Sequence, residues 1–241
     1  MKILITGSSG FIGFHLAKKL LESGNNVQGI DSMNNYYDVN LKNSRLKILK
    51  KYKNFSFTKT KLENKKKLDK IFYKFKPEIV VHLAAQAGVR YSIEKPRVYL
   101  DSNITGSYNI IEISKILNVK HLVMASSSSV YGANKKIPFK ETDKTETQLS
   151  IYASTKKSNE SLAHSYSNIW KIPITMLRFF TVYGPWGRPD MALFKFTKGI
   201  LNNKKIDIYN YGKMYRDFTY IDDIVNGIKL LINKPPKLNQ L

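Results

Sequence analysis

The opening residues 1–13, MKILITGSSGFIG, decide the fold of this chain. Residues 2–6 form an apolar run of strand length, and residues 11–23 follow with the apolar spacing of a helix. The turn between them has glycine at every third position: Gly7, Gly10 and Gly13. Such a turn lets backbone N–H groups approach a pyrophosphate, which the helix N-terminus then stabilises. Because the glycines stand between a strand and a helix, they indicate a dinucleotide site.

The next strand brings a carboxylate to the same place. Asp31 ends an expected strand over residues 26–31. There it can accept hydrogen bonds from a ribose 2′-hydroxyl, and it would repel a 2′-phosphate. No arginine follows immediately in the sequence. The expected cofactor is therefore NAD rather than NADP.

Strands and helices continue to alternate through the middle of the chain. Helices are expected over residues 41–52, 65–75, 103–117 and 152–170, and strands over residues 55–58, 79–83, 121–126 and 174–180. The strand at residues 79–83 is apolar on both faces, as in a parallel sheet that helices cover on each side. The predicted fold class is α/β, a Rossmann-like doubly wound parallel sheet.

The pattern changes after Gly184-Pro185. A helix is expected at residues 191–201, extended pieces at 206–209 and 217–220, and a last helix at 222–232. We expect residues 1–180 to form the NAD-binding domain that carries the catalytic residues. Residues 181–241 are expected to form a smaller substrate-binding region whose C-terminal part is missing.

Composition narrows the class of protein. The chain has 40 Lys and Arg against 18 Asp and Glu, a formal charge of +22, but the lysines are scattered, so we expect compositional bias rather than nucleic-acid binding. The absence of cysteine excludes disulfides and thiolate chemistry, and the four histidines are too far apart in sequence to indicate a metal site. No apolar run reaches bilayer length, so a cytoplasmic protein without membrane insertion is expected.

A second site is indicated by Tyr152 and Lys156, which stand four residues apart in the run SIYASTK. On a helix this spacing places a phenol and an ammonium on one face, beside a cofactor ribose. A nearby cation lowers the pKa of a phenol from about 10, so Tyr152 becomes a usable base. Ser127, which follows the strand at residues 121–126, is the expected third partner.

With these residues in place, the chain resembles the extended short-chain dehydrogenase/reductase family of nucleotide-sugar enzymes. Four further stretches resemble those of UDP-glucuronate 4-epimerases: DSMNNYYD at 31–38, AAQAGVRY at 84–91, YGPWGRPDMA at 183–192 and YGKMYRDF at 211–218. These stretches are long, and they are distributed over almost the whole chain.

The resemblance implies an isomerase that holds NAD tightly, interconverts UDP-glucuronate and UDP-galacturonate, and serves polysaccharide biosynthesis. Tyr152 would take the proton of the sugar 4-hydroxyl while a hydride leaves carbon 4. The 4-keto sugar would rotate and take the hydride back on its opposite face. The implied catalytic residues are Ser127, Tyr152 and Lys156. The implied NAD contacts are Gly7, Gly10, Phe11, Ile12, Gly13, Asp31, Ala84 and Lys156.

The resemblance also implies residues for the substrate. Thr181 stands where related epimerases and dehydratases often have Asn, and its small hydroxyl leaves room for a carboxylate on sugar carbon 5. Ser128 and Arg188 are expected beside Thr181 around that carboxylate, and Arg216 at the UDP phosphates. A homodimer formed by the helices at residues 103–117 and 152–170 is also implied.

Two departures from the family keep alternatives open. Lys61 stands where the family usually presents an Asp to the adenine, so weaker NAD binding is expected. The chain is also shorter than the family, so it is expected to be a truncated or partial protein. The alternatives are a UDP-glucuronate decarboxylase or another nucleotide-sugar enzyme of this family, or a truncated NAD-binding protein without turnover. Ser128-Ser129 replace the Asp-Glu pair of dehydratases, which argues against dehydration.

Overall fold

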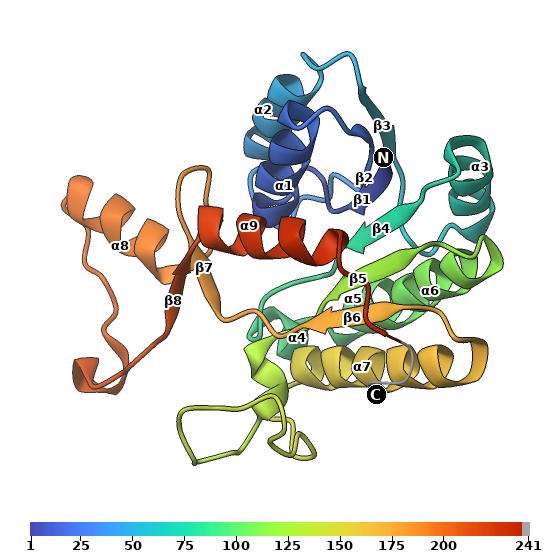
Figure 1. Cartoon of the computed structure of the whole chain (residues 1–241). Coiled ribbons are helices and arrows are strands. Elements are labelled where there is room, and N and C mark those ends of the chain that lie inside the picture. Colours follow the sequence, from blue (N-terminus) through green and yellow to red (C-terminus); the bar gives the residue numbers. More distant parts are fainter. Residues whose placement is uncertain (238–241) are drawn as a thin grey trace.

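The computed structural model describes residues 1–237 and has a six-stranded parallel sheet at its centre (Figure 1). Its strands are β1 (Lys2–Thr6), β2 (Asn26–Asp31), β3 (Phe55–Lys59), β4 (Ile79–His82), β5 (His121–Ala125) and β6 (Ile174–Leu177). They lie in the order β3-β2-β1-β4-β5-β6. The order reverses between β1 and β4, so a crevice for a ligand is expected at the carboxyl ends of these two strands. The predicted α/β, Rossmann-like fold class is confirmed.

Helices cover the sheet on both faces. They are α1 (Phe11–Glu22), α2 (Val39–Leu49), α3 (Lys65–Phe75), α6 (Gly106–Ile116) and α7 (Ile151–Trp170). Side chains alternate along each strand, so Ile3 and Ile5 join a core with α1, whereas Leu4 joins a second core with α3, α6 and α7. This alternation explains why the central strands are apolar throughout.

The chain after β6 builds a smaller part. It contains β7 (Thr181–Tyr183) and β8 (Phe218–Tyr220), which pair in parallel, with α8 (Ala192–Leu201), the 3-10 turn η3 (Tyr209–Gly212) and α9 (Ile221–Ile232). The last helix, α9, packs against α1 through buried apolar residues such as Val225 and Ile228. By contrast, α8 projects away from the large sheet, and none of its residues 192–201 is buried (Figure 1).

Three expectations about local structure are met only in part. The helix expected at 103–117 begins as a π-helical segment, η1 (Leu100–Thr105), in which Asn103 is fully buried and bonds to both backbone groups of Gln86. The strand expected at 174–180 ends at Leu177, and the chain then crosses to β7 in the other sheet. In the piece expected to be extended at 206–209, Ile208 has an extended backbone, and η3 begins at Tyr209.

Several short elements were not predicted. The helices α4 (Tyr91–Glu94) and α5 (Pro96–Tyr99) precede η1, and the 3-10 turn η2 (Ser128–Tyr131) follows β5. They are too short to produce a helical period in the sequence. Within residues 1–237, none of the helices combines the length and the apolar character needed to cross a bilayer.

Candidate active site

The glycine turn between β1 and α1 is closed so tightly that a side chain does not fit. Gly7 has a φ of +74°, and a Cβ on Gly13 would lie 2.1 Å from the Gly7 carbonyl oxygen. The buried hydroxyls of Ser8 and Ser9 have no hydrogen-bond partner among the described residues. Since buried polar groups are rarely left without a partner, these hydroxyls and the nearby N–H groups fit a polar ligand such as a pyrophosphate.

The carboxylate of Asp31 lies against this turn, as the sequence predicted. It accepts a hydrogen bond from the backbone N–H of Ser9 at 3.1 Å and another from that of Met33 at 2.8 Å. A carboxylate has about four acceptor positions, so both oxygens can still receive ribose hydroxyls. Lys61 is exposed just beyond β3.

Two buried basic residues of α2 were missed by the sequence analysis. Lys42 donates to the backbone and side-chain oxygens of Asn34, and Arg45 donates to the Ser9 carbonyl at 3.0 Å. Their burial was hard to predict, because a short lysine-rich helix usually lies on the surface. Their spacing of three residues, which places them on one face of a helix, was the available signal.

The structure brings Ser127, Tyr152 and Lys156 together at the carboxyl end of β5. Ser127 follows that strand, while Tyr152 and Lys156 lie in the first two turns of α7, whose N-terminus is capped by Ser150. Lys156 is buried and donates to the Ala125 carbonyl at 2.7 Å. Burial lowers the pKa of its ammonium to about 8.

The acidity of Tyr152 is set by opposing effects. Burial raises the pKa of its phenol and outweighs a hydrogen bond from Ser127 and the positive charge of Arg188, which lower it. The lowering of this pKa expected from Lys156 is not seen. The contribution of Arg188 was not predicted from the sequence, since 36 residues separate it from Tyr152. The phenol therefore lies between a hydroxyl and a guanidinium that both favour its ionised form.

Arg188 is held by an ion pair on its own loop. Its Nε donates to Oδ1 of Asp190 at 3.1 Å, and the Tyr36 hydroxyl donates to Oδ2 at 3.2 Å. Burial by itself pushes the pKa of Asp190 up, but the pair with Arg188 outweighs it and leaves that pKa below its usual value. One edge of the guanidinium is thus occupied, and within residues 1–237 no hydrogen bond is made by Nη1, which can donate to a second anion.

Aromatic rings form a row of contacts that ends at the phenol of Tyr152. Tyr36 contacts Tyr91 at 5.1 Å between ring centroids, Tyr91 contacts Tyr99 at 6.3 Å, and Tyr99 contacts Tyr152 at 6.2 Å. The row joins Tyr152 to Tyr36, whose hydroxyl donates to Asp190 of the Arg188–Asp190 pair. Apolar ring surface limits the access of water, which strengthens charge interactions inside the site.

The other residues singled out in the sequence lie on several different elements. Ala84 follows β4 and donates its N–H to Thr6 at 3.1 Å, and Ser128 donates its N–H to the Phe179 carbonyl at 2.8 Å. Thr181 begins β7 and pairs with Phe218. Arg216, two residues before Phe218, is exposed. Phe11 and Ile12 lie in the first turn of α1, between Gly10 and Gly13.

Comparisons of the sequence identify relatives. The profile described as "NAD dependent epimerase/dehydratase family" matches residues 3–240. The chain is 61% identical to Protein CapI of Staphylococcus aureus, covering 100% of this chain and 72% of that protein. It is 54% identical to a probable UDP-glucuronate 4-epimerase of Rhizobium meliloti, covering 98% and 69%. UDP-glucuronate 4-epimerase 1 of Arabidopsis thaliana is 49% identical, and the chain spans 54% of its length.

The comparison with solved structures also finds 4-epimerases of nucleotide sugars. The UDP-glucuronic acid 4-epimerase of Bacillus cereus, in complex with UDP-glucuronic acid and NAD, aligns with a TM-score of 0.91 at 38% identity over 98% of this chain and 74% of that one. The UDP-glucose 4-epimerase of Thermotoga maritima with UDP-glucose aligns with a TM-score of 0.87 at 32% identity, covering 96% and 73%.

Proposed function

Because this chain belongs to the NAD dependent epimerase/dehydratase family, we propose that it interconverts UDP-glucuronate and UDP-galacturonate by inverting carbon 4 through a transient 4-keto sugar. The observation that carries this proposal is that Tyr152, flanked by Ser127, meets Arg188, a half-buried cation suited to a sugar carboxylate. The Rhizobium meliloti relative and the Bacillus cereus structure support the same substrate.

The cofactor in this proposal is NAD, which when bound supplies the acceptor and donor of the hydride of carbon 4. The turn at residues 7–13 holds its pyrophosphate, with Phe11, Ile12 and Ala84 beside it, and Asp31 receives a ribose hydroxyl. Lys156 binds the second ribose. Residues 1–180 form this NAD-binding part, and residues 181–241 form part of the substrate-binding region, although 238–241 lie outside the described residues.

Proton transfer falls to the residues around Tyr152. The phenolate takes the proton of the sugar 4-hydroxyl, and Ser127 donates a hydrogen bond to the phenolic oxygen. Ser128 and Thr181 border the space for the sugar carboxylate together with Arg188, and Arg216 meets the phosphates of UDP. The location that fits these requirements is the cytoplasm, where NAD and nucleotide sugars are available.

The test is a proton NMR time course of the protein with NAD and UDP-glucuronate. We expect new anomeric signals of UDP-galacturonate and no UDP-pentose. A UDP-pentose would instead identify a decarboxylase. An unchanged spectrum from folded protein that binds NAD would identify a binding protein without turnover, and it would contradict the proposal.

Replacing Arg188 tests how the substrate carboxylate is recognised. We expect Arg188→Met to weaken binding of UDP-glucuronate by about 10- to 100-fold, because a hydrogen bond to a charged group contributes about 1.5–3 kcal/mol. Binding of UDP-glucose, which has no carboxylate, should change less than about threefold. Calorimetric titration of NAD-loaded protein measures both. The exposed Arg97, changed to Met, is the matched control, and equal losses for both sugars would contradict the assignment.

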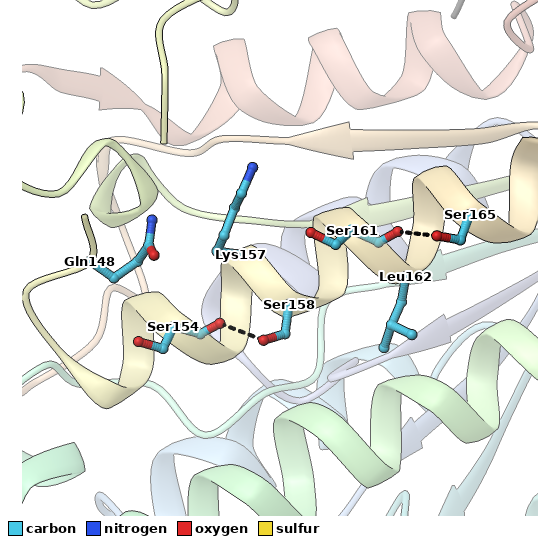
Figure 2. A pocket seen from close by; sticks show the side chains of 7 residues that line it. All are labelled: Gln148, Ser154, Lys157, Ser158, Ser161, Leu162 and Ser165. Carbon is cyan, nitrogen blue, oxygen red and sulfur yellow. Dashed lines mark hydrogen bonds between the residues drawn. The ribbon is translucent and has the colours of Figure 1, made fainter. Parts of the chain in front are cut away.

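A homodimer through α6 and α7 is also part of the proposal. Five large apolar side chains on these helices are exposed: Tyr108, Ile116, Ile151, Ile169 and Trp170. A shallow hollow along α7 is lined by small or flexible residues, among them Ser154, Ser158, Ser161 and Ser165 (Figure 2). The hydroxyls of Ser158 and Ser165 bond back to helix carbonyls, so a helix of a second copy can approach closely.

A bulky charge in this hollow should separate the copies. We expect Ser161→Arg to shift the protein from dimer to monomer at micromolar concentration, because a guanidinium would be buried against the partner without a counter-charge. Light scattering after size-exclusion chromatography at about 0.15 M salt, where the strong positive charge is screened, measures the mass. Ser44→Arg on the exposed side of α2 is the control. A dimer that survives Ser161→Arg would exclude this face.

A further inference from the structure

Arg45 of α2 is a fully buried arginine whose described partners include no carboxylate. Its guanidinium donates hydrogen bonds to four neutral acceptors: the carbonyls of Ser9, Trp186 and Gly187, and the hydroxyl of Tyr37. Its Nε has no partner among residues 1–237. Arginine keeps its charge in proteins, and an apolar side chain of similar volume is usually less costly in a core. Packing alone therefore does not explain why a charged residue is buried at position 45.

The acceptors of Arg45 belong to two different parts of the site. Nη1 bonds to Ser9 in the glycine turn, whose own N–H is bonded to Asp31. Nη2 bonds to Trp186 and Gly187, which directly precede Arg188. The planar guanidinium of Arg45 thus joins the expected pyrophosphate turn to the loop that carries Arg188, the proposed carboxylate-binding residue. Arg45 and Trp186 are 141 residues apart in the sequence.

The loop at residues 184–188 is held in its conformation by contacts with other segments of the chain. Trp186 has a φ of +60°, which residues other than glycine rarely adopt. Two contacts come from α1: the His15 ring donates from Nε2 to the Pro185 carbonyl at 2.9 Å, and the Phe14 ring lies 5.8 Å from that of Trp186. Burial lowers the pKa of His15, so its ring is neutral near pH 7. Arg45 adds the bonds nearest to Arg188.

We propose that Arg45 is a positioning residue that holds the loop at residues 184–188 against the glycine turn and so places Arg188 for the sugar carboxylate. The inference rests on the proposed function, because it concerns the same carboxylate. A consequence is that NAD and the sugar acid bind cooperatively: a ligand that orders the turn at Ser9 also fixes, through Arg45, the loop that receives the carboxylate. The effect is reciprocal, since the coupling free energy is shared by both ligands.

The experiment titrates UDP-glucuronate and UDP-glucose into NAD-loaded Arg45→Lys, Arg188→Met and the double variant. Lysine keeps the charge but cannot bridge carbonyls on two loops. We expect Arg45→Lys to weaken UDP-glucuronate binding about tenfold and UDP-glucose binding less than about threefold. If Arg45 acts through Arg188, the double variant binds UDP-glucuronate no more than about twofold weaker than Arg188→Met alone. The exposed Lys47 on the same helix, changed to Met, is the control and should change neither affinity.

Three results would overturn the proposal. They are equal weakening for both sugars, losses that multiply in the double variant, and no change with Arg45→Lys. If Arg45→Lys does not fold, Tyr37→Phe decides the matter, because it removes one acceptor of Arg45 and should weaken UDP-glucuronate selectively by about two- to fivefold. An Arg188→Met variant that binds both sugars normally would refute the carboxylate site itself, which separates failure of the proposed function from failure of the role of Arg45.

Discussion

Tyr152→Phe is expected to lower the turnover number for UDP-glucuronate by about 100- to 10,000-fold, the range that general acid–base groups contribute. The variant keeps the ring that packs against Tyr99 but removes the oxygen that takes the 4-hydroxyl proton. Affinities for NAD and UDP-glucuronate should stay within about threefold of the parent protein. The measurements are NMR rates and calorimetric titration of both ligands.

The matched control is Tyr166→Phe on the same helix. Tyr166 donates to Glu112 at 2.7 Å between α7 and α6, so its loss should lower thermal stability slightly without changing the rate. A Tyr152→Phe variant that retains more than about a tenth of the activity would show that another group takes the proton.

Lys156→Met is expected to lose activity and gain stability. The activity should fall by about 100-fold, because Lys156 is the proposed partner of the cofactor ribose, and displacing a reacting group by about 1 Å can cost about that factor. The fold disfavours the charged form of Lys156, whose pKa drops from 10.5 to about 8. At about 1.4 kcal/mol per pH unit this corresponds to a destabilisation of about 3 kcal/mol, which methionine should relieve. Denaturant unfolding at pH 7 measures the gain.

The pH dependence checks the origin of that gain. Below pH 8, Lys156 is charged in both folded and unfolded protein, so the full penalty is present. As the pH rises from 8 to 10.5, the folded protein releases the proton first, and the penalty disappears. The stability difference between Lys156→Met and the parent protein should therefore shrink over this window. A variant less stable than the parent at pH 7 would contradict the burial argument.

The part of the site that could be predicted from sequence is local in the chain. The strand, glycine turn and helix at residues 2–23 are contiguous in the sequence. Tyr152 and Lys156 lie one helical turn apart. Residue spacing alone therefore indicated the glycine turn and the Tyr152–Lys156 pair. The strands of the large sheet were predicted to within a few residues because they are short apolar runs between helices. The last of them, Ile174–Leu177, ended early because the chain leaves for the second sheet, a choice made by tertiary contacts.

The missed part depends on contacts between distant segments. The bond from Arg45 to Trp186 joins positions 141 residues apart, and that from Tyr36 to Asp190 joins positions 154 apart. The sequence around Arg45 and around Tyr36 has no periodic pattern that distinguishes a buried cation or phenol from an exposed one. The charge of Arg188 on Tyr152 likewise arises only when the folded chain brings β7 and its loop beside α7.

The packing of α9 on α1 has a consequence for biosynthesis. Ser23 at the end of α1 and Lys229 in α9, which are hydrogen-bonded, lie 206 residues apart. At translation rates of about 5–20 residues per second, α9 is synthesised about 10 to 40 s after α1, the helix that it covers. During that interval the apolar side of α1 is open to other nascent chains and to chaperones. Synthesis of this fold is therefore most vulnerable to aggregation before its last helix has emerged from the ribosome.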